Sequence, residues 1–332
     1  MRLHRLGANG PELPALGLGC MGMSPLRPRP GGHDAAKDAE SIATIQAALD
    51  AGIRLIDTGD FYGMGHNELL VREALRGRRD QAFLSVKFGM LVAPGGQPLG
   101  LDIGPRAMKN FCSYSLERLD TDAIDLYQPG RVPTSLPIEE TVGAIADLIK
   151  EGKVRYLGLS EVTGEQLRRA HAVHPVTAVE IEYSLAGRAI EDDLLPAARE
   201  LGVGIVAYSV AAQGLLTGAL EGPLPADDAR NRTPRLQGEA LAKNLEVVAE
   251  FKSFAETRGW TPTQLAAAWV TAQGEDIVAL IGMSRRDRIH ENLAAADIRL
   301  STDDLAALDR MFAPGAIVGD RYAPQILQMW RS

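Results

Sequence analysis

The chain has 332 residues, of which 45% are hydrophobic and 23% are charged, as in ordinary globular proteins. Its 35 basic and 43 acidic residues give a net charge of -8, which argues against a nucleic-acid or anionic-membrane partner. Two cysteines are too few for a disulfide framework or a zinc site, and no apolar run reaches the roughly 18 residues of a membrane span. The N-terminus lacks the apolar stretch of a signal peptide, so we expect a cytoplasmic protein.

Short apolar segments alternate with amphipathic ones along most of the chain. Residues 1–14 alternate polar and apolar side chains around Asn9-Gly10, a dipeptide that favours hairpin turns. Eight strands are predicted after this hairpin, at 16–20, 53–57, 82–87, 123–127, 154–159, 176–181, 204–208 and 277–281. Helices are predicted at 39–51, 67–75, 106–119, from Pro137, after the Thr163–Gln166 capping box, and at 192–201, 239–258, 262–273, 285–296 and 303–311. Residues 219–238 are expected to form a long polar loop and 314–332 a C-terminal tail.

The strands are almost continuously apolar, which is typical of parallel strands that are covered on both faces. Eight such units predict a single (β/α)8 barrel domain over residues 1–332, with an N-terminal hairpin and extra C-terminal helices. The structural alternative is a doubly wound open sheet, which needs a glycine-rich phosphate loop after its first strand. Residues 17–22 match the GxGxxG pattern, but Pro25, Pro28 and Pro30 follow where a helix would have to begin.

Polar side chains gather at the predicted C-terminal ends of the strands, where barrel enzymes carry their chemistry. Asp57 ends the second strand, Tyr62 follows shortly after it, and Lys87 ends the third strand. A nearby ammonium group lowers the pKa of a tyrosine from its usual value of about 10, and a carboxylate keeps the lysine charged and oriented. We therefore predict that Tyr62 is a general acid activated by Lys87 and Asp57. Each of the three residues alone is equally compatible with an ordinary loop or surface position.

The segments around these residues resemble the aldo-keto reductase family along nearly the whole chain. The matching segments are 55–63 with Asn67-Glu68, 85–87, 125–127, 152–160, 182–185, 207–218 and 281–292. The resemblance implies a (β/α)8 barrel that reduces aldehydes and ketones with a nicotinamide cofactor, usually NADPH. It also implies that Tyr62 is the general acid, Lys87 its activator and Asp57 the partner of Lys87.

The resemblance further implies a cofactor site along the strand ends. Tyr183 would stack on the nicotinamide ring, Ser160 would hold its carboxamide, and the loop 219–238 would fold over the pyrophosphate. The residues expected to bind the cofactor are Ser160, Glu180, Tyr183, Tyr208, Ser209, Leu215, Gly218, Gly282, Ser284, Arg285, Arg288, Glu291 and Asn292.

The segment after the last strand also favours an anion on physical grounds. Ser284 is predicted to cap a helix whose first turns carry Arg285, Arg286 and Arg288. Cations at a helix N-terminus oppose the helix dipole, so three of them favour a bound anion, the alternative being a solvated basic turn. The 2′-phosphate of NADPH is the anion that we expect, which favours NADPH over NADH.

The sequence departs from the family at the group that polarises the substrate carbonyl. The family usually has a histidine after the fourth strand, in a pattern like Tyr-x-x-His-Arg, but residues 127–131 read YQPGR and Gly130 takes that place. Glu161 stands where an asparagine is usual, and Glu180 stands where a glutamine is common near the cofactor amide. Three residues have a side chain of suitable type to replace the histidine as a donor: His4, His66 and Gln128.

Several functions remain open at this point. We favour carbonyl reduction by the triad alone; the alternatives are a catalytically weak or inactive NADPH-binding sensor or regulatory subunit, and a Schiff-base enzyme that uses Lys87. The arginine cluster disfavours the Schiff-base enzyme, and strand ends without histidines disfavour a metal site. The substrate is expected to be a small carbonyl compound in an apolar pocket near Gly130, lined by Met21, Met23, Phe61, Phe88 and Trp330. The sequence does not define the oligomeric state.

Overall fold

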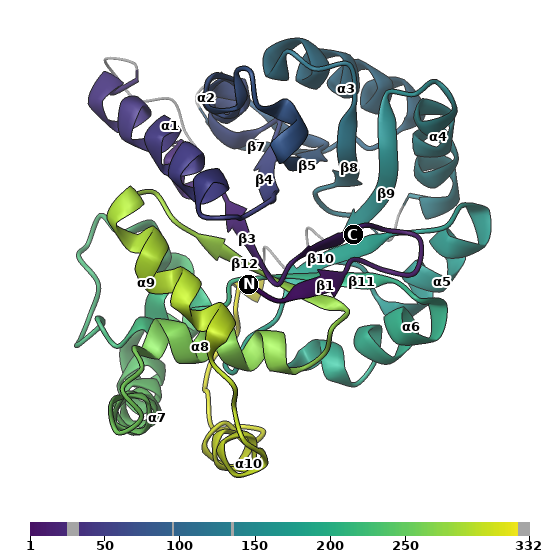
Figure 1. Cartoon of the computed structure of the whole chain (residues 1–332). Helices are drawn as coiled ribbons and strands as arrows, with labels where there is room; N and C mark the ends of the chain where they lie inside the picture. Colours follow the sequence, from purple (N-terminus) through teal and green to yellow (C-terminus); the bar gives the residue numbers. More distant parts are fainter. Residues whose placement is uncertain (25–32, 95, 134–135, 325–332) are drawn as a thin grey trace.

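The computed structural model describes residues 1–24, 33–94, 96–133 and 136–324. Eight parallel strands close into a barrel, in which each strand pairs with the next one and the last pairs with the first (Figure 1). The strands are β3 (Leu16–Gly19), β4 (Leu55–Gly59), β5 (Phe83–Phe88), β8 (Ile124–Pro129), β9 (Val154–Ser160), β10 (Ala178–Glu182), β11 (Gly204–Tyr208) and β12 (Ile277–Gly282). The predicted (β/α)8 barrel is confirmed.

Helices surround the barrel, and all but the last two of them lie between consecutive strands of the chain (Figure 1). They are α1 (Ala35–Asp50), α2 (His66–Leu75), α3 (Pro105–Leu119), α4 (Ile138–Lys150), α5 (Gly164–Val173), α6 (Leu194–Leu201), α7 (Gly238–Glu256), α8 (Pro262–Ala272), α9 (Ile289–Leu293) and α10 (Thr302–Met311). The predicted capping box of Thr163 and Gln166 begins α5, and boxes of the same kind begin α8 and α10. Local sequence signals therefore fix where these three helices start.

The alternation of side chains along the strands divides the core into two layers. Inward-facing apolar side chains, among them Leu55, Phe83 and Leu126, fill the interior of the barrel. Outward-facing ones, such as Ile56 and Leu84, pack with the helices in a larger cluster. Inward positions nearer the C-terminal ends of the strands carry polar side chains instead. The buried polar side chains are therefore concentrated at the mouth of the barrel that these strand ends form.

A two-stranded hairpin, β1 (Leu3–Arg5) and β2 (Glu12–Pro14), covers the opposite mouth of the barrel. Leu6 and Leu13 are buried against the interior cluster, and the backbone between the strands bonds to the segment that precedes β11. The predicted hairpin is confirmed, but its connection spans residues 6–11 and is longer than the Asn-Gly pair alone.

Some predicted segments differ in the structure. A second hairpin, β6 (Met90–Val92) with β7 (Pro98–Leu101), is absent from the sequence prediction because the glycines and prolines around it indicate a loop. The predicted helix at 285–296 is divided into a 3₁₀ turn at Arg286–Arg288, the short α9, and a further turn at Ala294–Asp297. Pro137 is the N-cap residue of α4 and not its first helical residue.

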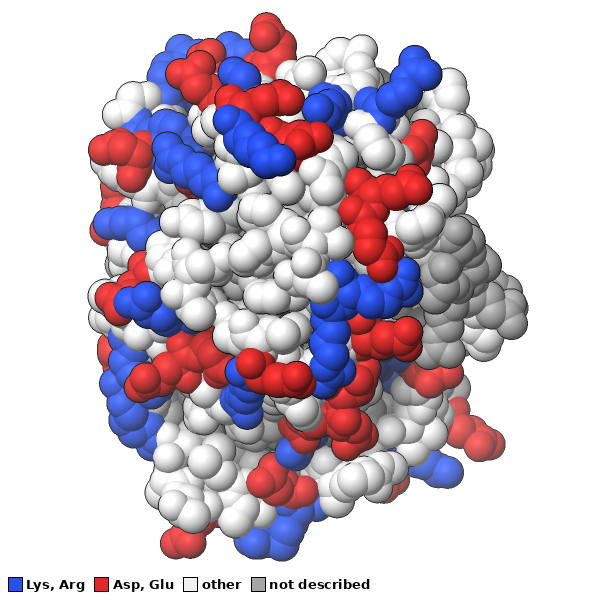
Figure 2. Space-filling view, turned by 90° about the vertical axis from the view of Figure 1, so that its right-hand side faces the viewer, with Lys and Arg blue, Asp and Glu red and all other residues white. Residues whose placement is uncertain are grey.

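Charges of both signs are mixed over the surface. Figure 2 shows acidic and basic side chains next to one another on the face in view, without a large area of one sign. Exposed pairs join neighbouring helices, for example Arg169 with Glu139 at 2.8 Å and Arg168 with Glu200 at 2.7 Å. Within the described part of the chain, no helix is long and apolar enough to cross a membrane.

Candidate active site

Inward-facing polar side chains from four strands meet at the C-terminal mouth of the barrel. The strand register places Asp57 beside Ser85 and Lys87 beside Gln128, and Glu180 reaches the same group from β10. All five side chains are buried. They have the same parity along their strands as the apolar residues of the barrel interior, which explains why they point inward.

The ammonium group of Lys87 lies between two carboxylates. Its Nζ atom donates to the two oxygens of Asp57 at 2.6 and 2.5 Å and to both oxygens of Glu180 at 3.0 Å. The side chains of Asp57, Lys87 and Glu180 are only 3%, 5% and 5% exposed. Removing one member of such a buried ion pair leaves an uncompensated charge, so this arrangement holds the lysine charged and fixed in place.

Ser85 and Gln128 complete the hydrogen bonds around Lys87. The Ser85 hydroxyl donates to Asp57 at 3.0 Å, and Nε2 of Gln128 donates to Ser85 at 3.0 Å and to Glu180 at 2.6 Å. These bonds use both protons of the amide nitrogen, whereas Oε1 of Gln128 has no hydrogen-bond partner among the described residues. Gln128 can therefore offer a bound group an acceptor, but not the donor that Gly130 lacks.

A tight turn after β4 brings Tyr62 to this group. Gly63, Met64 and Gly65 have φ angles of 58°, 53° and 90°, and this left-handed backbone leads directly into α2. Tyr62 is buried, and Nζ of Lys87 lies 5.5 Å from the centre of its ring. The structure thus brings Tyr62, Lys87 and Asp57 together and adds Glu180 to them.

The electrostatics of this group differ from those expected. Burial raises the pKa of Tyr62 above its usual value; Lys87 acts to lower it, but Asp57 and Glu180 oppose Lys87. Burial acts to lower the pKa of Lys87, and the two carboxylates more than reverse this. Burial and the neighbouring Glu180 raise the pKa of Asp57 to about 8. The expected net lowering of the Tyr62 pKa is therefore not found, and the phenol is held in its protonated form.

Gly130 follows β8 at the same mouth, and the ring of Phe61 lies beside it. A Cβ atom at position 130 would lie only 3.3 Å from Cε1 of Phe61 and 3.4 Å from the carbonyl oxygen of Phe88. The Phe61 ring also packs edge-on against Tyr62, with 4.9 Å between the ring centres. Phe61 thus occupies part of the space in which a side chain at position 130 would begin.

A second polar group lies at this mouth, around Glu161. Glu161 accepts hydrogen bonds from the Tyr208 hydroxyl at 2.8 Å and from Nη1 of Arg321 at 2.8 Å, and the Tyr208 and Tyr322 hydroxyls are 3.0 Å apart. Its φ angle of 55° lies in the left-handed region, which disfavours a residue like glutamate. Arg321 and Tyr322 belong to the C-terminal tail, so this part of the tail contacts the mouth of the barrel.

The chain matches a known protein family over the whole of the barrel that carries this site. The model of the Aldo/keto reductase family matches residues 15–312, from the first barrel strand to the end of the last helix. A Glycine max protein named "Probable aldo-keto reductase 1" is 39% identical over 320 residues, which cover 96% of this chain and 91% of that protein. The chain belongs to the aldo-keto reductase family.

Solved structures of other proteins share this aldo-keto reductase fold over almost the whole chain. A glycerol dehydrogenase from Gluconobacter oxydans has a TM-score of 0.85 and 29% identity, covering 97% of this chain and 98% of that one. An aldo/keto reductase from Klebsiella pneumoniae, solved in complex with NADP and acetate, has a TM-score of 0.73 and 29% identity, covering 97% and 99%. The barrel that carries the polar mouth is therefore common to proteins of this family.

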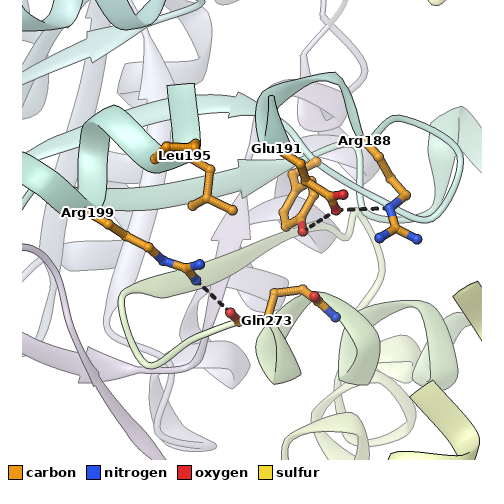
Figure 3. A pocket seen from close by; sticks show the side chains of 7 residues that line it. Arg188, Glu191, Leu195, Arg199 and Gln273 are labelled. Atoms are coloured by element: carbon orange, nitrogen blue, oxygen red, sulfur yellow. Dashed lines mark hydrogen bonds and ion pairs between the residues drawn. The ribbon is translucent and has the colours of Figure 1, made fainter. Parts of the chain in front are cut away.

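Tyr183 does not belong to the mouth of this aldo-keto reductase. Because Glu182 faces inward, the next side chain faces outward: the Tyr183 ring packs on Trp269 at 5.2 Å, and its hydroxyl donates to Glu191 at 2.7 Å. It lines a pocket of about 440 Å³ on the outer side of the barrel, where Glu191 also accepts a bond from Arg188 (Figure 3). The predicted stacking of Tyr183 on a nicotinamide ring is therefore wrong.

Phe88 does not face the predicted substrate pocket, because its side chain also points outward from the barrel. It follows the inward-facing Lys87, is fully buried, and stacks on Tyr127 with 4.4 Å between the ring centres. Of the other residues predicted to line the pocket, Phe61 and Gly130 adjoin the mouth, Met21 is 50% exposed in the turn after β3, and Trp330 lies outside the described residues.

The arginines that follow β12 already have carboxylate partners. The pairs are Arg285 with Asp287, Arg286 with Glu40, and Arg288 with Glu291. Ser284 is not a helix cap either, because the turn begins at Arg285 and has no side-chain hydrogen bond to its backbone. These cations therefore do not require a bound anion, contrary to the prediction. Their place in a cofactor site rests on the family resemblance.

The remaining candidates fall into two sets. Ser209, at φ 57°, has a buried hydroxyl without a hydrogen-bond partner among the described residues. Other predicted cofactor residues have these positions: Leu215 and Asn292 are buried, Gly218 has φ 70°, and Gly282 is exposed at the end of β12. The two histidines considered as donors in place of the missing one lie elsewhere. His4 belongs to the hairpin at the opposite mouth and bonds to the Ile277 carbonyl, and His66 lies between Ser24 and Asp38.

Three residues of the site are absent from the sequence prediction. Ser85 shares the inward parity of Lys87 two positions later, so the strand pattern could have revealed it. Arg321 and Tyr322 lie in a tail without helix or strand periodicity, and no local signal points to their contacts with Glu161 and Tyr208.

Proposed function

We propose that the protein is an NADPH-dependent reductase of aldehydes and ketones, with Tyr62 as the proton donor. The observation that carries this proposal is the buried group of Tyr62, Lys87 and Asp57 at the barrel mouth. NADPH, when bound, would supply the hydride that the carbonyl carbon accepts. The NADP-bound relative from Klebsiella pneumoniae supports this choice of cofactor.

The residues at the mouth suit such a cofactor. Oε1 of Gln128 and Oγ of Ser209 are buried without protein partners among the described residues, and a bound ligand commonly satisfies atoms of this kind. Tyr208 has the inward parity of Val206, so we propose that its ring, in place of that of Tyr183, would stack on the nicotinamide. The proposed cofactor residues are Ser160, Glu180, Tyr208, Ser209, Leu215, Gly218, Gly282, Ser284, Arg285, Arg288, Glu291 and Asn292.

Each residue of the triad has a defined part in proton transfer. The Tyr62 hydroxyl donates its proton to the substrate oxygen as that oxygen gains negative charge. The Lys87 ammonium then stabilises the phenolate, which recovers a proton from solvent. Asp57 holds Lys87 in its charged form. A Schiff-base reaction at Lys87 is disfavoured because it needs a neutral amine, whereas two carboxylates hold this amine protonated.

Gly130 supports one alternative, a cofactor-binding sensor with little or no turnover, since the residue that usually polarises the carbonyl is missing. A cofactor-consumption assay separates the two. The enzyme should oxidise NADPH, and NADH more slowly, when a reactive aldehyde such as 4-nitrobenzaldehyde is added. NADPH binding without turnover on a broad panel of aldehydes and ketones would favour the sensor.

A further inference from the structure

Two carboxylates share one ammonium group at the centre of this site. Lys87 lies within hydrogen-bonding distance of both Asp57 and Glu180, and all three side chains are at most 5% exposed. When both acids are ionised, the group carries one net negative charge that solvent does not screen. An uncompensated buried charge is costly unless a ligand of opposite sign balances it.

The position of Glu180 places this charge beside the proposed nicotinamide site. On neighbouring strands, Glu180 is the register partner of Ser160, the residue proposed to hold the carboxamide. Neighbouring strands lie about 4.8 Å apart, so the carboxylate and the Ser160 hydroxyl belong to the same part of the mouth.

We infer that Glu180 makes the site discriminate between the two redox forms of its cofactor, binding NADP⁺ more tightly than NADPH. This inference rests on the proposed function. The oxidised ring carries a positive charge that the reduced ring lacks, and a buried carboxylate favours the charged form. Tighter binding of the oxidised form makes the bound cofactor a stronger hydride donor. Glu180 thereby assists reduction from the cofactor side, where Gly130 gives no help from the carbonyl side.

Other charges at the mouth are paired among themselves. Glu182 lies 3.1 Å from Arg235, and Glu161 is bound by Arg321. Arg131 donates to the Gly130 carbonyl at 2.5 Å and to the Ser160 hydroxyl at 3.5 Å, and its charge interacts with that of Glu161. Since these residues are unchanged in Glu180→Gln, the substitution changes the charge only within the group of Asp57, Lys87 and Glu180.

The test is the ratio of the dissociation constants for NADPH and NADP⁺, measured by titration calorimetry. The titrations are run above pH 8, because burial and Glu180 raise the pKa of Asp57 to about 8 and the Asp57 carboxyl group must be ionised for the group to carry its net charge. Glu180→Gln keeps the shape but removes the charge, and should lower this ratio by about tenfold. The exchange of both side chains, Glu180→Gln with Gln128→Glu, moves the carboxylate to the side chain that now donates to Glu180 at 2.6 Å, and it should restore most of the ratio.

The outcomes separate this inference from the proposed function. A ratio that Glu180→Gln leaves within about twofold, or that the exchange does not restore, would overturn the role of Glu180 while leaving NADPH-dependent reduction intact. Failure of the wild-type protein to bind either nucleotide would contradict the proposed function and this inference together. If Glu180→Gln does not fold, the neutral Glu180→Met provides the second test: it should lower the ratio to a similar extent, and an unchanged or higher ratio would refute the inference.

Discussion

Lys87 decides the electrostatics of the site because it is the cation that Asp57, Glu180 and Tyr62 share. The charge of the two acids keeps the lysine protonated, and burial keeps the Tyr62 phenol protonated. A proton donor and a cation that stabilises its conjugate base are thus both in the required state before any substrate arrives. What the site lacks is a side chain that could polarise the substrate carbonyl, because Gly130 has none and Phe61 fills the adjoining space.

Gly130 and Phe61 should therefore respond to substitution as a pair. Gly130→His alone forces its Cβ within 3.3 Å of the Phe61 ring, so we expect little or no gain in kcat/KM for aldehyde reduction. Gly130→His combined with Phe61→Ala gives the imidazole room to reach the carbonyl, and kcat/KM should rise by about tenfold over Phe61→Ala alone. Equal kinetics for the double variant and Phe61→Ala would mean that another group already polarises the carbonyl.

Asp60 should make the stability of the protein depend on pH. Burial, and then the nearby Glu68, raise its pKa to about 8, although Arg118 and the backbone N–H groups of Gly89 and Phe61 oppose this. The unfolded chain releases this proton near the usual pKa of about 3.9, so the stabilisation is complete below that pH and is lost as the pH rises through 8.

The neutral variant Asp60→Asn removes this dependence. We expect it to be more stable than the wild type by about 2 kcal/mol above pH 8 and to have no advantage near pH 4, as measured by thermal unfolding. The exposed Asp80→Asn serves as the control and should track the wild type at both values. A stability difference that does not change with pH would show that Asp60 is ionised throughout.

At the scale of the elements, sequence patterns predicted strands and helices better than the directions of their side chains. The eight strands follow from apolar runs, and the capping box at Thr163 marks the start of α5. The prediction for Tyr183 was wrong because the family resemblance assigns a residue to a strand end without its parity, and that for Phe88 was wrong because this residue was taken as part of a loop, whereas it belongs to β5. Counting alternate positions from Lys87 and Glu180 would have put both rings on the outer face.

The N-terminal hairpin is expected to stabilise the barrel without affecting its chemistry. Leu6 is fully buried against the interior cluster at the mouth opposite Tyr62. Leu6→Ala should lower the free energy of unfolding by about 3 kcal/mol, measured by chemical denaturation, with kcat unchanged at temperatures where the variant is folded. Leu3→Ala is the matched control, since Leu3 is 59% exposed and should cost little. A loss of kcat in the folded Leu6 variant would connect the hairpin to the active site.

At the scale of the whole molecule, the fold and its chemistry were predictable to different degrees. The alternation of strands and helices was sufficient to predict a closed barrel, and the barrel implies that Asp57 and Lys87 meet at one mouth. The contacts of Arg321 with Glu161 were not predictable, because they join residues 160 positions apart through a tail without periodicity. The contact of Lys87 with a second carboxylate was equally unpredictable, because Glu180 comes from a strand that is not adjacent to β5.

The central claim is that Tyr62 donates the proton to the carbonyl oxygen. The most direct measurement is kcat for NADPH-dependent aldehyde reduction by Tyr62→Phe, together with its NADPH dissociation constant. Tyr127→Phe is the matched control, since the Tyr127 hydroxyl bonds to the Met108 carbonyl on the outer side of the barrel. We predict that Tyr62→Phe lowers kcat by about 100-fold or more with NADPH binding unchanged, while Tyr127→Phe retains activity. A Tyr62→Phe enzyme that turns over at the wild-type rate would contradict this account.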